Sequence, residues 1–167
     1  QIVSDALTIV ERLEHRAGKD ATGQVGDGVG VLLQMPHKLY STFGFDLGQK
    51  GDYGVGMFFF PRENLQRRQA QKLFEVICGK ERVRFLGWRQ VPVDPEILGA
   101  PARDSMPGIY QCFVARPEDV DRGLAFDRRL YVIRRVFEQS SEGTYVCSFS
   151  SRTVVYKGMF LVNQLRK

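Results

Sequence analysis

Strand-like segments that come in pairs between helical segments are the feature of this sequence that most limits its fold. Runs rich in Val, Ile, Phe and Tyr that end near proline, glycine or serine are typical of strands. We expect strands at residues 29–35, 53–60, 83–88, 109–115, 144–149 and 153–156. A doubly wound parallel fold needs strands and helices to alternate singly, so paired strands favour an α+β domain with antiparallel or mixed sheets and helices stacked outside them.

Apolar residues at helical spacing predict the helices between these strand pairs. We expect helices over residues 2–14, 62–78 and 118–138, a short helix or turn over 37–46, and a helical pattern that runs to Lys167. Four prolines make residues 92–108 irregular. The 167 residues contain 43% hydrophobic side chains, which suits one globular domain over residues 1–167. No apolar run approaches the roughly 20 residues of a membrane-spanning helix, and no signal peptide is visible at the start.

The formal charge of +5 is weak support for nucleic-acid binding. The densest basic stretch, Asp127–Arg135, alternates arginines with Leu130, Val132 and Ile133. This spacing is typical of the solvent-facing side of an amphipathic helix, and we favour that interpretation over a nucleic-acid interface.

The cysteines and histidines do not form a recognisable metal or catalytic motif. Cys78, Cys112 and Cys147 are far apart and odd in number, and His15 and His37 lie in no HExxH-like pattern. Zinc ligation and disulfide frameworks use other spacings, so we expect no metal site. The cysteines are expected to be reduced, buried thiols of a cytoplasmic protein.

The glycine cluster Gly26–Gly30 (GDGVG) fails as a dinucleotide-binding fingerprint. That motif follows a strand and opens a helix, whereas this cluster precedes a strand and has Val31 where the spacing would need further glycine. We expect a tight turn with positive φ angles and close backbone packing at the start of the strand. Gly54 and Gly56, inside the next strand, likewise suggest a bulge or the close approach of another backbone.

Several segments, taken in order, resemble one known family. Residues 12–18 read RLEHRAG, residues 26–30 read GDGVG, and residues 148–159 read SFSSRTVVYKGM. These resemble the RLEHRG, GDGAGI and SSRTIVYKGM segments of the class II glutamine amidotransferase domain in the glutamate synthase large subunit. Shorter matches fall between them in the same order, so the resemblance covers essentially the whole chain.

This resemblance implies a four-layer αββα sandwich of the N-terminal-nucleophile type, with largely antiparallel sheets. In that family an N-terminal cysteine attacks the side-chain amide of L-glutamine, releases ammonia and forms a glutamyl thioester that water hydrolyses. Its own α-amino group is the base, and backbone and Asn donors stabilise the oxyanion. In full-length glutamate synthases the ammonia reaches a synthase region that contains FMN and an iron–sulfur cluster and aminates 2-oxoglutarate.

The family pattern places key residues outside these 167. The catalytic cysteine belongs on a strand before the helix that starts near Ile2, yet the first residue here is Gln1. The family segments HSRFSTN and HNGEI, which supply substrate and oxyanion contacts, follow YKGM and have no match here. We therefore expect a domain truncated at both ends, with its nucleophile upstream of Gln1, no catalytic residue and no cofactor within the chain, and no glutaminase activity alone.

Two residues carry over from the neighbourhood of the family's active site. Arg16 is a candidate support for that site, and Ala17 stands where the family usually has glycine. The remaining motif matches are expected to be architectural or to flank the site: Gly26, Asp27, Gly28, Gly30, Ser151, Arg152 and Lys157.

A second hypothesis belongs to another functional class. The chain could be a degenerate amidotransferase-like module that binds or assembles without catalysis. The native mass of the protein discriminates the two, because a mass near 19.0 kDa favours the module. The first hypothesis implies L-glutamine and an ammonia-receiving synthase domain or subunit as partners, with neither nucleic acid nor membrane.

Overall fold

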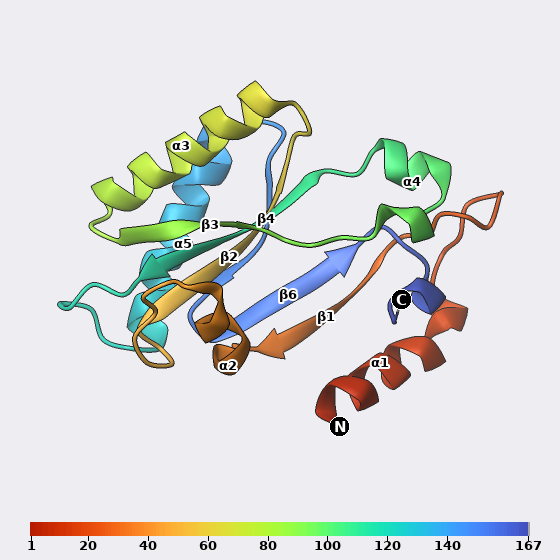
Figure 1. Ribbon diagram of the computed structural model, residues 1–167, viewed down its shortest axis with the longest axis horizontal. Coiled ribbons are helices and arrows are strands. Elements are labelled where there is room, and N and C mark those ends of the chain that lie inside the picture. Colours follow the sequence, from red (N-terminus) through yellow and green to blue (C-terminus); the bar gives the residue numbers. More distant parts are fainter. Residues whose placement is uncertain (167) are drawn as a thin grey trace. The chain divides into compact units, whose positions relative to one another are not determined.

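The computed structural model describes residues 1–166, which form two compact units (Figure 1). Unit 1 comprises Gln1–Leu32, Pro92–Met106 and the described part of Val155–Lys167. Unit 2 comprises Leu33–Val91 and Pro107–Val154. Within residues 1–166, no helix is long and apolar enough to cross a membrane.

Unit 2 is built on a four-stranded sheet in the order β3-β4-β2-β5. All neighbours in this sheet are antiparallel, with Gly56 of β2 opposite Cys112 of β4. The strands are β2 (Tyr53–Phe60), β3 (Arg84–Gln90), β4 (Gly108–Ala115) and β5 (Tyr145–Ser150). The expected α+β class with antiparallel pairing is confirmed.

Two long helices, α3 (Asn64–Lys80) and α5 (Leu124–Ser140), pack on one face of this sheet. Alternating residues of the strands point to this face, so Phe58, Cys112 and Val146 share one apolar core with both helices. Phe58 alone contacts five other aromatic rings of the core. Helical spacing of apolar residues in the helix expected over 118–138 predicts one buried face, and all four residues of that face are fully buried in α5: Phe126, Leu130, Ile133 and Phe137.

The other face of the sheet carries a smaller aromatic cluster. It is covered by α2 (His37–Tyr40), the 3-10 turn Ser41–Phe43 and the loop that follows. Phe113 of β4 lies at its centre, stacked on Phe45 with ring centroids 4.5 Å apart. Residues 37–43 are therefore helical, as the sequence predicts.

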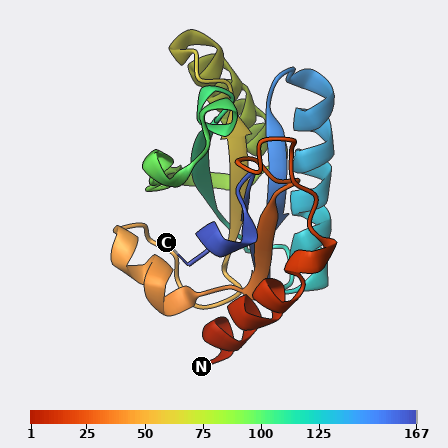
Figure 2. The same ribbon diagram turned by 90° about the vertical axis from the view of Figure 1, so that its right-hand side faces the viewer.

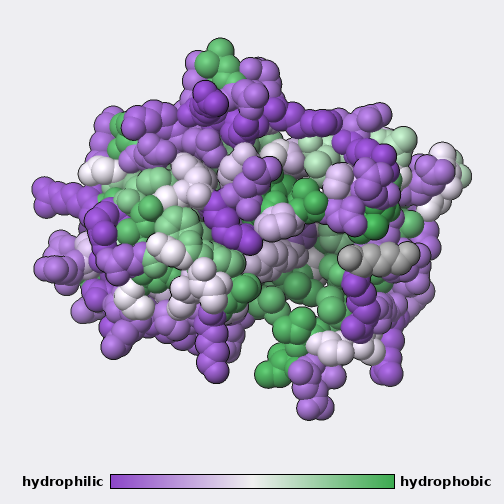
Figure 3. Space-filling view, in the orientation of Figure 1, coloured by the Kyte–Doolittle hydropathy of each residue, from purple (hydrophilic) through white to green (hydrophobic). Residues whose placement is uncertain are grey.

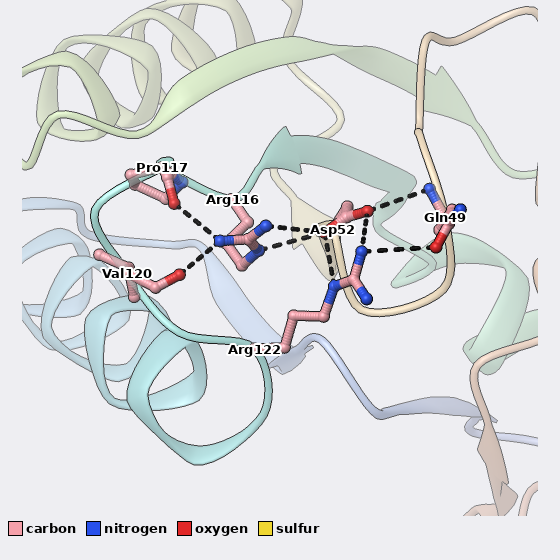
Figure 4. Close-up of polar contacts among 6 residues, drawn as sticks. All are labelled: Gln49, Asp52, Arg116, Pro117, Val120 and Arg122. Carbon is pink, nitrogen blue, oxygen red and sulfur yellow. Dashed lines mark hydrogen bonds and ion pairs between the residues drawn. The ribbon is translucent and has the colours of Figure 1, made fainter.

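The helix predicted to start at residue 118 begins only at Leu124. The preceding residues form a loop because the guanidinium of Arg116 donates to the carbonyls of Pro117 and Val120, and Gly123 has a positive φ of 78°. Arg116 and Arg122 also bind the carboxylate of Asp52, at 2.9 and 2.7 Å (Figure 4). Hydrogen bonds from Arg122, and then from Arg116, hold the pKa of Asp52 well below its usual value.

Gly54 and Gly56 are crowded by side chains rather than by another backbone. A Cβ on Gly54 would lie 2.6 Å from Leu130 Cδ1 of α5, and one on Gly56 would lie 2.7 Å from Cys112 Sγ. Both glycines pair regularly with β4, and the register of β2 with β5 shifts only farther along the strand, between Met57 and Phe58.

Unit 1 contains α1 (Ile2–Arg12), which continues into the 3-10 turn η1 (Glu14–Arg16). The segment predicted to be irregular holds two short helices, η3 (Pro95–Ile97) and α4 (Ala100–Asp104). The predicted final helix is wrong: a single 3-10 turn, η4 (Val162–Gln164), is present, and Lys167 lies outside the described residues.

The apolar side of α1 is largely uncovered. None of its residues is buried, and Ile2 and Ile9 are 83% and 61% exposed. Figure 3 shows apolar side chains gathered near the first turn of this helix.

The strands β1 (Val29–Gln34) and β6 (Thr153–Gly158) form a separate two-stranded sheet. Figure 1 shows them side by side and pointing in opposite directions. Consecutive strands β5 and β6 thus belong to different sheets, and the chain turns sharply between them at Ser151 and Arg152.

Candidate functional site

Arg16 and Ala17 stand where η1 passes into the loop of residues 17–28. The amide of Arg16 donates to the Leu13 carbonyl at 2.9 Å, and that of Ala17 donates to the Glu14 carbonyl at 3.0 Å. Ala17 has φ −84° and ψ 126°, an extended conformation open to any L-residue. Alanine therefore fits at this position without backbone strain. The Arg16 side chain is exposed to solvent.

Asp20 shapes the tip of this loop. Its carboxylate accepts hydrogen bonds from the amides of Gln24 and Val25, both at 3.0 Å, and from the Thr22 hydroxyl at 2.6 Å. The Thr22 hydroxyl, followed by the amide donors, lowers the pKa of Asp20. A short carboxylate side chain that satisfies amides a few residues ahead is a common way to close a turn.

The loop returns to its own base at Gly26 and Asp27. Lys19 and Gly26 form an isolated antiparallel bridge, and the amide of Asp27 donates to the Gly18 carbonyl at 3.2 Å. Gly26 is buried, whereas Asp27 is exposed with its carboxylate beside the Cα of Gly18. The RLEHRAG and GDGVG segments therefore lie next to each other in unit 1.

Gly28 and Gly30 allow β1 to lie close to β6. Gly28 has a φ of 100°, and a Cβ there would sit 2.9 Å from the Gly158 carbonyl oxygen. A Cβ on Gly30 would lie 2.5 Å from the Tyr156 carbonyl oxygen and 2.9 Å from the Cα of Lys157. The expected positive φ and close backbone packing are confirmed, and Lys157 is brought to the GDGVG segment.

Ser151 and Arg152, in unit 2, both bind the carboxylate of Asp127, a residue that no sequence motif singles out. The backbone amide and hydroxyl of Ser151 both donate to Asp127 Oδ1, at 2.7 and 2.9 Å. The hydroxyl of Ser150 reaches the same oxygen at 3.2 Å, and Arg152 Nε binds Asp127 Oδ2 at 2.6 Å. Asp127 thus holds the turn between β5 and β6. Its position in the first turn of α5 was the only available signal for this role.

Cys78 and Cys112 are unsuited to act as nucleophiles. Cys78 and Cys112 are buried in the apolar core, and burial raises the pKa of Cys78 to about 12 and that of Cys112 far above its usual value. Cys147 is a half-buried residue of β5. A thiol must be a thiolate to attack, and burial in apolar surroundings opposes this.

No group of three or more His, Cys, Asp or Glu within residues 1–166 could hold a metal ion. The three cysteines are also fewer than the four thiolates that usually ligate an iron–sulfur cluster. These residues therefore do not fit the cluster that the family resemblance associates with a full-length synthase.

The sequence of this chain is similar to those of known proteins of one family. A family model described as "Glutamine amidotransferases class-II" matches residues 1–167. Ferredoxin-dependent glutamate synthase 2 of Synechocystis sp. is 39% identical over 163 residues, covering 95% of this chain and 10% of that protein. The glutamate synthase [NADPH] large chain of Bacillus subtilis is 36% identical over 170 residues, covering 98% of this chain and 11% of that protein.

The ferredoxin-dependent glutamate synthase of Spinacia oleracea is 35% identical over 169 residues, covering 95% of this chain and 10% of that protein. The chain spans about a tenth of the length of these relatives. Its antiparallel sheets and packed helices agree with an α+β amidotransferase domain of the N-terminal-nucleophile type. The chain belongs to the class II glutamine amidotransferase family.

Proposed function

We propose that this chain is part of the glutaminase domain of a glutamate synthase-type protein. That domain hydrolyses L-glutamine to glutamate and ammonia, and the ammonia aminates 2-oxoglutarate in a synthase domain or subunit. The observation that carries the proposal is the family match over residues 1–167, together with relatives that are named glutamate synthases and are aligned over 95% or more of the chain.

The nucleophilic thiol is expected on a segment of the natural protein outside residues 1–167. The burial of Cys78 and Cys112 and the raised pKa values of their thiols support this, because neither is accessible to glutamine or ionised near neutral pH. The thiolate adds to the amide carbon, ammonia leaves, and water cleaves the resulting thioester. Residues 1–167 alone are proposed to lack this activity.

Arg16 is proposed to support the active site from the edge of the 17–28 loop. Its exposed guanidinium, on a hydrogen-bonded turn that abuts the GDGVG segment, is available to a carboxylate or carbonyl group. Gly26, Asp27, Gly28, Gly30, Ser151, Arg152 and Lys157 are proposed to keep architectural or flanking roles. FMN and an iron–sulfur cluster are proposed to bind to the synthase part of the protein. A cytoplasmic location stays a prediction.

Covalent labelling locates the nucleophile directly. The natural full-length protein is treated with a glutamine analogue that carries an electrophilic carbon at the amide position, and labelled peptides are sequenced by mass spectrometry. We expect one glutamine-protectable label, on a cysteine outside residues 1–167. A protectable label on Cys78, Cys112 or Cys147, or the absence of any such label, would contradict the proposal.

A further inference from the structure

The segment Gly158–Arg166, called the 158–166 brace, contacts helix α1, which leads into the 17–28 loop, and the Gly26–Gly28 end of that loop, all within unit 1. Figure 2 shows its 3-10 turn, η4, beside α1. The brace is itself held by Gln164, whose side chain accepts from the Leu161 amide at 2.7 Å and donates to the Ile97 carbonyl. Only its first two residues, Gly158 and Met159, belong to a segment of the family resemblance, SFSSRTVVYKGM.

At one end, Arg166 fastens the brace to α1. Its guanidinium pairs with the carboxylate of Glu11, donates to the Thr8 hydroxyl at 2.9 Å and donates to the Ser4 carbonyl at 3.3 Å. These partners span two turns of one helix face. The hydrogen bond from Arg166 lowers the pKa of Glu11 below its usual value.

The hold on α1 extends to Arg16 through the backbone. Leu13 donates to the Val10 carbonyl at 3.0 Å, and Arg16 donates to the Leu13 carbonyl at 2.9 Å. Helix α1 and turn η1 are thus one hydrogen-bonded stretch, and a shift of α1 moves the backbone of Arg16 with it.

At the other end, the brace packs directly on the GDGVG segment. A Cβ on Gly26 would lie 3.2 Å from Leu161 Cδ2, and the backbone at Gly28 faces the Gly158 carbonyl. The brace therefore supports both the helix that leads into the loop and the segment that leaves it. The two sides of the loop are also joined by the Lys19–Gly26 bridge and by the amides of Asp27 and Asp20, which donate to the Gly18 and Val25 carbonyls.

We propose that Arg166 is a positioning residue for the amidotransferase site: by fastening α1 to the 158–166 brace, it sets the placement of Arg16 relative to the GDGVG segment. This inference rests on the proposed glutaminase function. Arg166 touches no reacting atom and acts through Glu11, Thr8 and the backbone of α1. An exposed pair adds little stability by itself, so its effect is expected on geometry rather than on folding.

The test uses the natural full-length protein with Arg166→Ala, Glu11→Ala and the double variant. A misplacement of about 1 Å in an active site can cost roughly a hundredfold in rate, and the displacement expected here is smaller. We expect each single variant to lose about tenfold in kcat/KM for glutamine, the double variant to lose no more than either single variant, and melting to stay unchanged. Amide exchange at residues 14–28 should quicken.

Lys72→Ala provides the matched control, because Lys72 is an exposed cation in a single ion pair with Glu75 on α3 of unit 2. Its kcat/KM and exchange should equal those of the wild type. Arg166→Lys, which keeps the charge but not the planar fork of donors that reaches Glu11, Thr8 and Ser4 together, should recover only part of the loss.

Unchanged exchange at residues 14–28 in Arg166→Ala, or losses that add in the double variant, would overturn the positioning role. If the wild-type protein released no ammonia from glutamine, the proposed function would fail. The exchange measurement would still decide whether the brace holds the loop.

Discussion

Asp127 is predicted to be the residue whose loss most disturbs the turn between β5 and β6. Its carboxylate is 14% exposed and accepts four hydrogen bonds, two of them from Ser151, which is 2% exposed. Asp127→Ala leaves the amide and hydroxyl of Ser151 buried without their acceptor. Each unsatisfied buried donor costs about 1–3 kcal/mol, and since such costs are not fully additive we expect a loss of about 3 kcal/mol.

Urea unfolding of the chain measures this loss. The single tryptophan, Trp88, is partly buried against the core that the four-stranded sheet shares with α3 and α5. Its fluorescence therefore reports the unfolding of unit 2. With a urea dependence of about 2 kcal/mol per molar, the midpoint should fall by about 1.5 M. Asp127→Asn keeps one carbonyl oxygen as an acceptor, and we expect it to cost about half as much.

Arg152→Ala is the matched control for the exposed side of the same cluster. Arg152 is 62% exposed, so its ion pair with Asp127 contributes no more than about 1 kcal/mol. If Asp127→Ala lowered the midpoint no more than Arg152→Ala does, the buried donors of Ser151 would not be the source of the stability, and the reasoning would be refuted.

Three further changes test other parts of the structure. Gly30→Ala places a Cβ against the backbone of β6 and should lower the free energy of unfolding in urea by about 1–3 kcal/mol. Gly79→Ala, in open space on α3, is the control and should be neutral or stabilising by up to about 1 kcal/mol. Equal effects of the two substitutions would contradict the close packing of β1 on β6. Arg116 and Arg122 lower the pKa of Asp52, so the wild type should have a higher free energy of unfolding than Asp52→Asn. This difference should be complete above about pH 5 and should decline as the pH falls below about 4. A difference that does not depend on pH would contradict this. Cys78 and Cys112 should resist alkylation at pH 8 in the folded protein and react in urea, and rapid reaction without urea would show that the core is open.

The elements that could be predicted from sequence are those whose limits are set locally. Strand β2 was predicted with its observed limits because an unbroken apolar run ends at Pro61. The buried stripe of α5 followed from helical spacing. The start of α5 could not be predicted, because the loop before it depends on contacts of Arg116 with Pro117, Val120 and the distant Asp52.

The spacing of apolar residues along the chain does not predict which strands pair or which polar side chains meet across the fold. The pattern of β5 and β6 is equally compatible with a hairpin, yet the two strands lie in different sheets. Asp127 begins a basic stretch whose spacing predicts only the solvent-facing side of a helix, although its carboxylate organises the SSRT turn. The close packing of the GDGVG segment can be predicted, because a positive φ and a close backbone approach both favour glycine.

Ammonia release from L-glutamine tests the central claim most directly. It is measured for the natural full-length protein and for residues 1–167 alone, each at matched concentration and with buffer as the blank. We predict that the full-length protein releases equal amounts of glutamate and ammonia and that residues 1–167 release none above the blank. A full-length protein without glutaminase activity, or release by residues 1–167 alone, would contradict this account.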